Sequence, residues 1–122
     1  MSDLNKYSYV ISIDINQYKT FVKLFSKINL NPKLFSGIKT YKNNAENCKQ
    51  SHIAIIKYAK KNNWPFVLIF EDDAYPCENC LELLTNYLKI IPKNADLILL
   101  GWSSHSKNEK QIFDLAYNKI TT

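Results

Sequence analysis

The sequence predicts an α/β domain with a mostly parallel sheet and helices on both faces. Segments with strand character alternate with segments whose apolar residues recur at helical spacing, in the order β-α-β-α-β-α-β with a tail. Two strand segments, residues 66–70 and 96–101, contain unbroken apolar runs, which are typical of strands covered on both faces. The 122 residues suit one core, so we predict a single α/β/α domain of three layers over residues 1–122.

The first half of the chain predicts two strands and one helix. Residues 7–13 are rich in β-branched and aromatic side chains and predict the first strand. A helix follows over residues 17–27, where apolar residues lie on one helical face. Pro32 marks its end, because the residue before a proline avoids the helical conformation. Residues 33–38 predict a short second strand.

A second helix is predicted after the polar loop of residues 40–47. It runs to about Lys61, and its apolar face includes His52. Asn44 or Asn47 is the predicted N-cap, because an asparagine side chain can accept a hydrogen bond from a free N–H group of the first turn.

The remaining elements follow a clear stop at residues 62–65, which include Trp64-Pro65. Residues 66–70 show no alternation, so we expect them to form the most buried strand. A helix is predicted over residues 78–91 and another buried strand over residues 96–101. Residues 112–120 predict only a weak final element.

The charge of the chain argues against a nucleic-acid partner. The net charge is +5, and all 16 basic residues are lysines, which are scattered along the chain. Nucleic-acid binders use arginine for bidentate contacts to bases and phosphates. The lysines therefore predict a solvated surface, with weak attraction to an anionic membrane face or to phosphorylated ligands as the alternative.

The sequence contains no visible targeting or membrane-spanning segment. Residues 1–6 lack the apolar core of a signal peptide. The longest apolar runs are about four to six residues, and a helix needs about 20 to cross a bilayer. We expect a soluble, cytoplasmic protein.

Three cysteines, Cys48, Cys77 and Cys80, are present. Cys77 and Cys80 form a C-x-x-C pair, but no second pair follows to complete a four-ligand structural zinc site. Reduced, partly buried thiols are the favoured interpretation. Thioredoxin-like redox chemistry is the alternative, because the pair lies near a predicted helix start.

Three consecutive carboxylates, Glu71, Asp72 and Asp73, follow the strand predicted to be most buried. Ligands of open parallel sheets bind at the carboxyl ends of strands. A hard divalent cation would offset the mutual repulsion of the carboxylates and could bridge to a diphosphate. Residues at i and i+2 can point to the same side, so Glu71 and Asp73 would share a side and Asp72 would not. A solvated acidic turn that caps the next helix is the alternative.

Three segments together resemble a known family in order and spacing. They are residues 48–52 (CKQSH, a C-x-x-S-H pattern), residues 66–74 (FVLIFEDDA) and residues 96–101 (DLILLG). This combination resembles the glycosyltransferase family 25 domain, which includes bacterial lipooligosaccharide galactosyltransferases. Residues 9–14 (YVISID) also look like the first strand of that family, and the resemblance covers about residues 7 to 101.

The resemblance implies a GT-A-like, Rossmann-like fold of which this chain is the N-terminal, donor-binding half. It implies a metal-dependent hexosyltransferase that moves galactose from a nucleotide sugar such as UDP-galactose to a glycan or lipid-linked saccharide such as lipooligosaccharide. Mn²⁺ or Mg²⁺ would be held by Asp73 and Glu71, with Asp72 near the metal, its water shell or the ribose. Such an enzyme would work in the cytoplasm, with peripheral association at the inner face of the membrane.

Three further polar residues are candidates for the donor site. The resemblance places Ser51 and His52 along the donor. For His52 a core histidine that is hydrogen-bonded to a neighbouring loop is the favoured interpretation, and the place along the donor is the alternative. His105 follows the predicted strand of residues 96–101, which is a ligand-facing position in this fold class, or it lies on the loop surface.

The sequence departs from the family pattern in two places. The family commonly has an arginine shortly after the first strand, and here Lys19 would supply only a point charge. Family members also continue well past the strand of residues 96–101, where the acceptor site is expected. Only His105, Glu109 and Asp114 are late polar candidates, so no catalytic base can be named and the chain resembles a short or truncated member.

Two other functions are weighed against the enzyme. A catalytically inactive remnant would bind metal and nucleotide sugar without transfer. A receiver-like phosphotransfer domain would also gather acids at strand ends. However, its acidic pair follows the first strand, where this chain has only Asp14.

Overall fold

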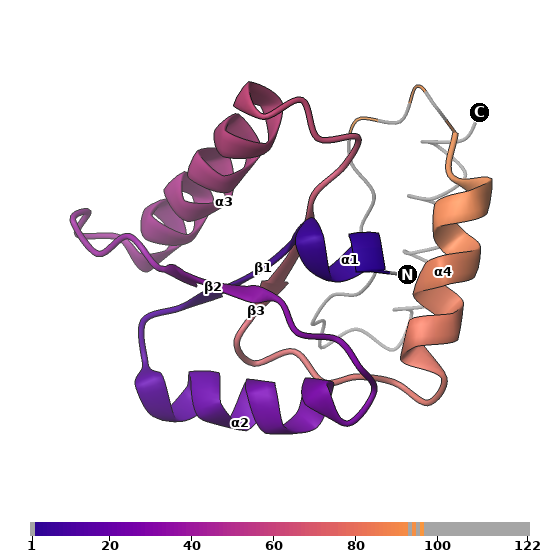
Figure 1. The fold of residues 1–122 in the computed structure, drawn as a ribbon. Coiled ribbons are helices and arrows are strands. Elements are labelled where there is room, and N and C mark those ends of the chain that lie inside the picture. Colours follow the sequence, from indigo (N-terminus) through magenta and orange to yellow (C-terminus); the bar gives the residue numbers. More distant parts are fainter. Residues whose placement is uncertain (1, 93, 95, 97–122) are drawn as a thin grey trace, which may run out of the picture. The chain divides into compact units, whose positions relative to one another are not determined.

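The computed structural model describes residues 2–92, 94 and 96 of the chain. Contacts divide the chain into two units, residues 1–83 and 84–122, and each is described by itself. The helices and strands of the first unit are α1 (Ser2–Lys6), β1 (Ser8–Ser12), α2 (Ile15–Ser26), β2 (Lys33–Ser36), α3 (Asn44–Lys61) and β3 (Leu68–Glu71) (Figure 1).

The three strands form one parallel sheet in the order β2-β1-β3. Val10 in the central strand β1 is in register with Leu34 on one side and with Phe70 on the other. The connections α2 and α3 return the chain to the same end of the sheet before each new strand, as parallel pairing requires. The predicted parallel sheet is confirmed for these strands.

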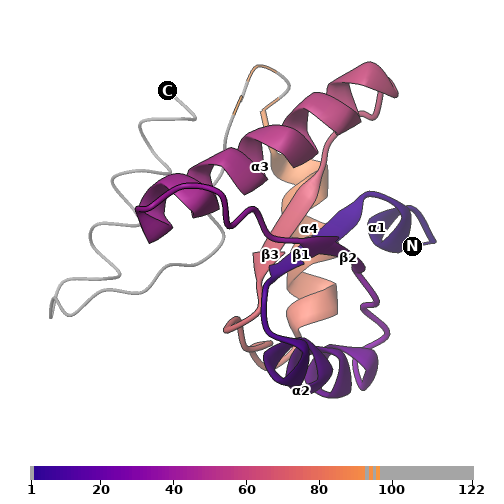
Figure 2. The same cartoon turned by 90° about the vertical axis from the view of Figure 1, so that its left-hand side faces the viewer.

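Helices α2 and α3 cover opposite faces of this sheet (Figures 1 and 2). Side chains alternate between the faces along a strand. The Phe70 ring therefore packs on α2, at 5.6 Å from Phe21 and 5.2 Å from Phe25 between ring centroids. Tyr9 points to the other face and meets Tyr58 of α3 at 6.3 Å. The predicted three-layer α/β arrangement is confirmed for this unit.

The most buried strand is β1, and the prediction that residues 66–70 would be most buried is wrong. Val10 is fully buried, and four of the five residues of β1 are buried. In β3 only Leu68 is buried, and β3 begins at Leu68, two residues later than predicted. The reason is the strand order. The strand β1 has neighbours on both edges, whereas within the described residues β3 pairs with β1 alone. The strand predicted over residues 96–101 lies outside the described residues except for Asp96.

Helix α2 begins at Ile15, two residues earlier than predicted, because Asp14 caps it. The Asp14 Oδ1 atom accepts hydrogen bonds from the backbone N–H groups of Asn16 (2.8 Å) and Gln17 (3.4 Å). A carboxylate at this place also complements the positive end of the helix dipole. The cap therefore fixes the first turn of α2 directly after the end of β1.

Helix α3 begins at Asn44 and is capped by Asn43, so the predicted caps Asn44 and Asn47 are wrong. The Asn43 Oδ1 atom accepts from the backbone N–H group of Ala45 at 2.7 Å. The Asn47 side chain instead accepts from the N–H group of Tyr41 (2.9 Å) and donates to its carbonyl oxygen (3.1 Å). Asn47 thus holds the preceding loop against the helix that Asn43 starts.

Aromatic residues hold the far end of α3 against the sheet. Trp64 stacks on Tyr9 with ring centroids 6.1 Å apart and meets Tyr58 edge to face at 5.5 Å. The Lys33 ammonium group lies 5.4 Å from the Trp64 ring, within the range of a cation–π contact. These contacts anchor the turn that was predicted from Trp64-Pro65.

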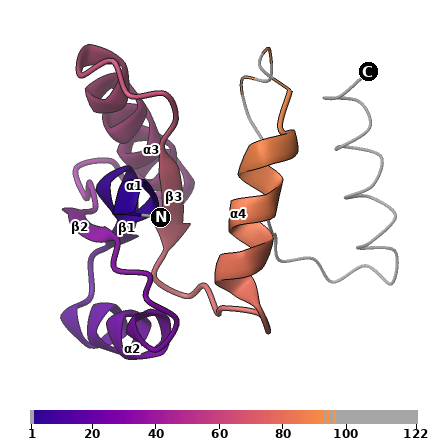
Figure 3. The ribbon, with the colours of Figure 1, turned by 45° about the vertical axis from the view of Figure 1, so that its right-hand side comes forward.

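Helix α4 (Cys80–Ile90) crosses the boundary between the two units, close to the predicted range of residues 78–91. Figure 3 shows α4 as a regular helix. Asn79, directly before it, has a φ angle of 59°, which asparagine tolerates better than most residues. In the described part of the chain, no helix is both long enough and apolar enough to span a membrane. The element predicted over residues 112–120 lies outside the described residues.

Candidate functional site

The carboxyl ends of β1 and β3 lie next to each other and carry the first polar contact of the site. The register pairs Ile11 with Glu71, so the next residues, Ser12 and Asp72, come together. The Ser12 hydroxyl is buried and donates a hydrogen bond of 2.7 Å to Asp72 Oδ2. The same hydroxyl lies 3.0 Å from the carbonyl oxygen of Asp14. Ser12 therefore links the end of β1 both to the acidic turn and to the start of α2.

Gln17 supplies a second partner for Asp72 from the first turn of α2. With its amide nitrogen turned toward the acidic turn, Gln17 Nε2 donates to Asp72 Oδ1 at 2.9 Å and lies 3.3 Å from Oδ2. The Asp14 cap places Gln17 there, because it fixes the backbone N–H group of Gln17. Both oxygens of the Asp72 carboxylate are thus oriented by the protein.

An open cleft of about 300 Å³ lies beside this carboxylate, between α2 and the turn after β3. This volume is at the lower end of the range for small-molecule pockets. It is lined by Asn16, Gln17, Thr20, Leu24, Asp72, Asp73, Ala74 and Tyr75. The cleft therefore combines two carboxylates with neutral polar groups and the exposed ring of Tyr75.

Asp73 lines the cleft with an exposed side chain. No hydrogen bond from the described residues reaches its carboxylate. Its charge also acts on the Cys48 thiol of α3. Asp73 therefore differs from Asp72: Asp72 is oriented by the chain, and Asp73 keeps its oxygens available to a ligand.

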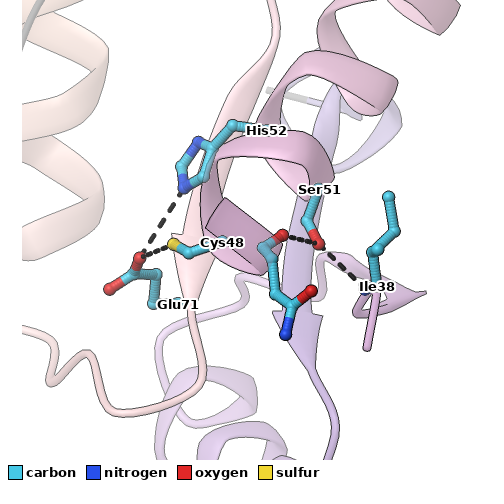
Figure 4. A network of polar contacts seen from close by, with 6 residues as sticks. Ile38, Cys48, Ser51, His52 and Glu71 are labelled. Atoms are coloured by element: carbon cyan, nitrogen blue, oxygen red, sulfur yellow. Dashed lines mark hydrogen bonds and ion pairs between the residues drawn. The ribbon is translucent and has the colours of Figure 1, made fainter. Parts of the chain in front are cut away.

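Glu71 faces the opposite side of the sheet and lies against α3 (Figure 4). The Cys48 Sγ atom donates to Glu71 Oε1 at 2.9 Å. His52 Nε2 lies 3.7 Å from the same oxygen and forms an ion pair with it when the imidazole is protonated. Glu71 and Asp72 thus contact different helices, as alternation along an extended segment predicts. The prediction that Glu71 and Asp73 share a side is wrong, because Asp73 lines the cleft together with Asp72. The strand ends at Glu71, and the alternation does not continue through the turn that follows.

The Cys48 thiol is held in its protonated form. Burial, the hydrogen bond to Glu71 and the charges of Glu71 and Asp73, in that order of importance, together raise its pKa to about 11. A thiolate beside these carboxylates would be repelled by them. At neutral pH Cys48 is therefore a hydrogen-bond donor, and without a bound cation it is a poor nucleophile.

Ser51 has a structural contact of its own. It is 1% exposed, and its hydroxyl donates to the carbonyl oxygen of Asn47 and accepts from the backbone N–H group of Ile38, each at 2.9 Å (Figure 4). The hydroxyl therefore ties the segment after β2 to α3. A direct contact between Ser51 and a nucleotide-sugar donor stays a prediction.

The favoured interpretation of His52 as a core histidine bonded to a loop is wrong. Its side chain is 36% exposed, and its partner is Glu71 at the end of β3. The helical spacing correctly places His52 on the face of α3 that is turned toward the sheet. His52 lies there beside the exposed end of β3 and not over its buried part. His105, Glu109 and Asp114 lie outside the described residues, so their roles stay predictions.

The C-x-x-C pair lies next to the start of α4, as predicted. Cys77 is exposed, Cys80 is half-buried, and both thiols are free. Burial, with the neighbouring Cys77 as a further cause, raises the pKa of Cys80. Cys80 is the second cysteine of the pair, and the redox alternative, which needs an activated first cysteine, stays a prediction. Reduced thiols are the interpretation that this geometry favours.

Ser12 and Gln17 are site residues that the sequence reasoning missed. Both follow from the strand order, because the end of β1 and the start of α2 lie beside the end of β3. The available signal was the position of Ser12 at the carboxyl end of the first predicted strand. Lys19, expected to replace an arginine, is exposed and is not among the residues that line the cleft.

Comparison with protein families gives a match that includes the C-x-x-S-H segment and the acidic triplet. The model of glycosyltransferase family 25 (LPS biosynthesis protein) matches residues 45–121, which is more than half of the 122-residue chain. Searches of curated proteins and of solved structures find no match. The family match agrees with the resemblance of the sequence, and the chain belongs to glycosyltransferase family 25.

Proposed function

We propose that this chain binds a nucleotide sugar in the cleft beside Asp72 and Asp73 and serves glycosyl transfer in lipopolysaccharide biosynthesis. Membership of glycosyltransferase family 25 supports the reaction class. The observation that carries the site is the Asp72 carboxylate, which Ser12 and Gln17 hold at the carboxyl ends of two adjacent parallel strands. Ligands of open α/β sheets bind at such strand ends.

The residues of the cleft fit a hard divalent cation, Mn²⁺ or Mg²⁺. Such ions prefer carboxylate oxygens and often keep only one or two protein ligands, with phosphate and water completing the shell. The Asp73 carboxylate is exposed and accepts no hydrogen bond from a described residue. The Asp72 carboxylate is held in one orientation by its hydrogen bonds. We therefore propose Asp73 as the principal ligand and Asp72 as its neighbour. Glu71, also predicted as a ligand, faces α3 and is left out of this proposal.

The cation would neutralise the charge that develops on the diphosphate leaving group. The residues of the chain would orient the donor. Asn16 and Thr20 present neutral polar groups to the cleft, and Tyr75 presents an exposed ring on which a nucleobase could stack. Gln17 would keep the Asp72 carboxylate in place as the donor enters. Each of these residues would contribute to the binding or the orientation of the nucleotide sugar.

The finer features of the reaction follow from the resemblance and are proposals. The donor would be UDP-galactose or a similar nucleotide sugar, and the acceptor a glycan or lipid-linked saccharide of lipooligosaccharide type. The protein would meet that acceptor in the cytoplasm, at the inner face of the membrane. The scattered lysines would favour an anionic surface there.

The experiment is a thermal-shift measurement of the full chain with a panel of nucleotide diphosphate sugars, first with Mn²⁺ and then with EDTA. A ligand that binds only the folded state raises the melting temperature by mass action. We expect one donor to raise it in Mn²⁺ and the rise to vanish in EDTA. A panel without any metal-dependent rise would contradict the proposal.

Transfer is then measured with the donor that gives the largest shift. The chain is incubated with that donor and a lipooligosaccharide acceptor, and the acceptor mass is followed. A gain of one hexose identifies the enzyme. Donor binding without such a gain identifies a binding domain that does not catalyse transfer.

A further inference from the structure

A second cluster of polar side chains lies on the α3 side of the sheet. The Cys48 Sγ atom, a His52 ring nitrogen and a Glu71 carboxylate oxygen all lie within 4.8 Å of one another. Figure 4 shows Cys48 and His52 both directed at the Glu71 carboxylate. A thiol, an imidazole and a carboxylate are the three side-chain types that bind Zn²⁺ in proteins.

Two elements of the fold bring these three ligands together. Cys48 and His52 are four residues apart on α3, so their side chains lie one above the other on the same helix face. Glu71 is the last residue of β3, where its register with Ile11 turns its side chain toward α3. The hydrogen bonds of Ser51 hold that part of α3 to the segment after β2. The cluster therefore rests on regular structure.

The distances between the three ligand atoms suit an ion with tetrahedral coordination. With usual zinc bond lengths, neighbouring ligand atoms of a tetrahedral site are about 3.3–3.6 Å apart. Here Glu71 Oε1 lies 2.9 Å from Cys48 Sγ and 3.7 Å from His52 Nε2. Small side-chain rotations would bring the three atoms to coordinating distance. The side chains of His52 and Glu71 are 36% and 53% exposed, so an ion can reach them from solvent.

We propose that Cys48, His52 and Glu71 bind one Zn²⁺ ion, with a fourth position open to water. On binding, the Cys48 thiol releases its proton to solvent, and the thiolate and the Glu71 carboxylate together balance the charge of the ion. The thiolate selects a borderline-soft metal over Mg²⁺ and Mn²⁺. This site is therefore distinct from the hard-cation site proposed at Asp72 and Asp73. The bound ion fastens α3 to the end of β3.

The test uses Co²⁺ as a spectroscopic substitute for Zn²⁺ in the full chain carrying Cys77→Ser and Cys80→Ser. These two substitutions leave Cys48 as the only thiol. We expect one equivalent of Co²⁺ to produce a thiolate-to-cobalt absorption band in the near ultraviolet, and Zn²⁺ to displace it. Cys48→Ser abolishes the band, and His52→Ala or Glu71→Gln weakens Co²⁺ binding by about tenfold or more.

The control variant is Asp72→Asn, which alters the donor cleft and leaves the three ligands in place. It should retain the cobalt band while weakening the binding of nucleotide sugar. Zn²⁺ should also raise the melting temperature of the parent chain, and Cys48→Ser should remove that rise. A folded parent chain without the band, or a band that survives Cys48→Ser, would overturn the proposal. The cobalt and zinc titrations contain no nucleotide sugar and no acceptor, so their failure leaves the proposed glycosyl transfer intact.

Discussion

Ser12 and Asp72 are 60 positions apart in the sequence, and a hydrogen bond of 2.7 Å joins their side chains. The bond connects the end of β1 to the turn after β3, at the strand ends where the sheet presents its ligand-binding edge. Gln17 reaches the same carboxylate from α2. Two segments of the chain, the end of β1 and the first turn of α2, thus fix this carboxylate beside the cleft.

Replacing Ser12 by alanine should weaken both folding and donor binding. The substitution removes a buried donor from a charged acceptor, a contact that contributes about 1.5–3 kcal/mol when well formed. Asp72 is partly exposed, so we expect a loss near the lower end of that range. Urea denaturation measures this loss, and calorimetric titration should show about tenfold weaker binding of nucleotide sugar, or about 1.4 kcal/mol.

Ser36→Ala is the matched control for Ser12→Ala. Ser36 is the register partner of Ser12 in β2, and its side chain is exposed. Surface substitutions of this kind usually change stability by less than about 0.5 kcal/mol. Equal losses in the two variants would show that the Ser12–Asp72 bond contributes nothing specific.

Ser51→Ala should cost stability while leaving the cleft unchanged. The substitution leaves the N–H group of Ile38 and the carbonyl oxygen of Asn47 without their buried partner, which costs about 1–3 kcal/mol. Urea denaturation measures the change, with the exposed Ser26→Ala as its control. Because Ser51 does not line the cleft, donor affinity should stay within about twofold of the parent. A selective loss of donor binding would instead show that Ser51 contacts the donor.

Glu71→Gln should make Cys48 more reactive. The pKa of the Cys48 thiol is about 11 because burial, the hydrogen bond to Glu71 and nearby negative charge all disfavour the thiolate. Glu71→Gln removes one negative charge, so the pKa falls, and more thiolate is present at any pH below it. Alkylation by iodoacetamide at pH 8 should therefore be faster in Glu71→Gln.

The alkylation rate is followed by mass spectrometry in EDTA, in chains that carry Cys77→Ser and Cys80→Ser. Glu78→Gln is the control, because it removes an exposed carboxylate that is not among the charges acting on Cys48. Identical rates in the parent and in Glu71→Gln would contradict the assigned cause of the raised pKa.

The elements of the sheet could be predicted because their signals are local. Residues 7–13 and 33–38 gave strands, and the spacing of apolar residues gave α2 and α3, each within a few residues of its observed range. The caps were less predictable. Three asparagines, Asn43, Asn44 and Asn47, lie at or near the start of α3, and only the backbone conformation decides that Asn43 is the cap.

The pairing of side chains could not be predicted, because it depends on strand order. The acidic triplet indicated a site at a strand end, but nothing local shows that β1 lies beside β3. That neighbour relation brings Ser12 and Gln17 to Asp72, and it also makes β1 the buried strand. The position of Cys48 and His52 beside Glu71 depends in the same way on how α3 crosses the sheet.

The most direct measurement of the central claim is calorimetric titration of the full chain with the donor that stabilises it most. Wild type, Asp73→Asn and Glu78→Gln are compared in Mn²⁺ and in EDTA. We expect wild type and Glu78→Gln to bind the donor equally in Mn²⁺, and EDTA to abolish binding. Asp73→Asn should bind at least about tenfold more weakly, a loss of about 1.4 kcal/mol or more. Donor affinity that is unchanged in Asp73→Asn, or unchanged in EDTA, would contradict a metal-dependent donor site in this cleft.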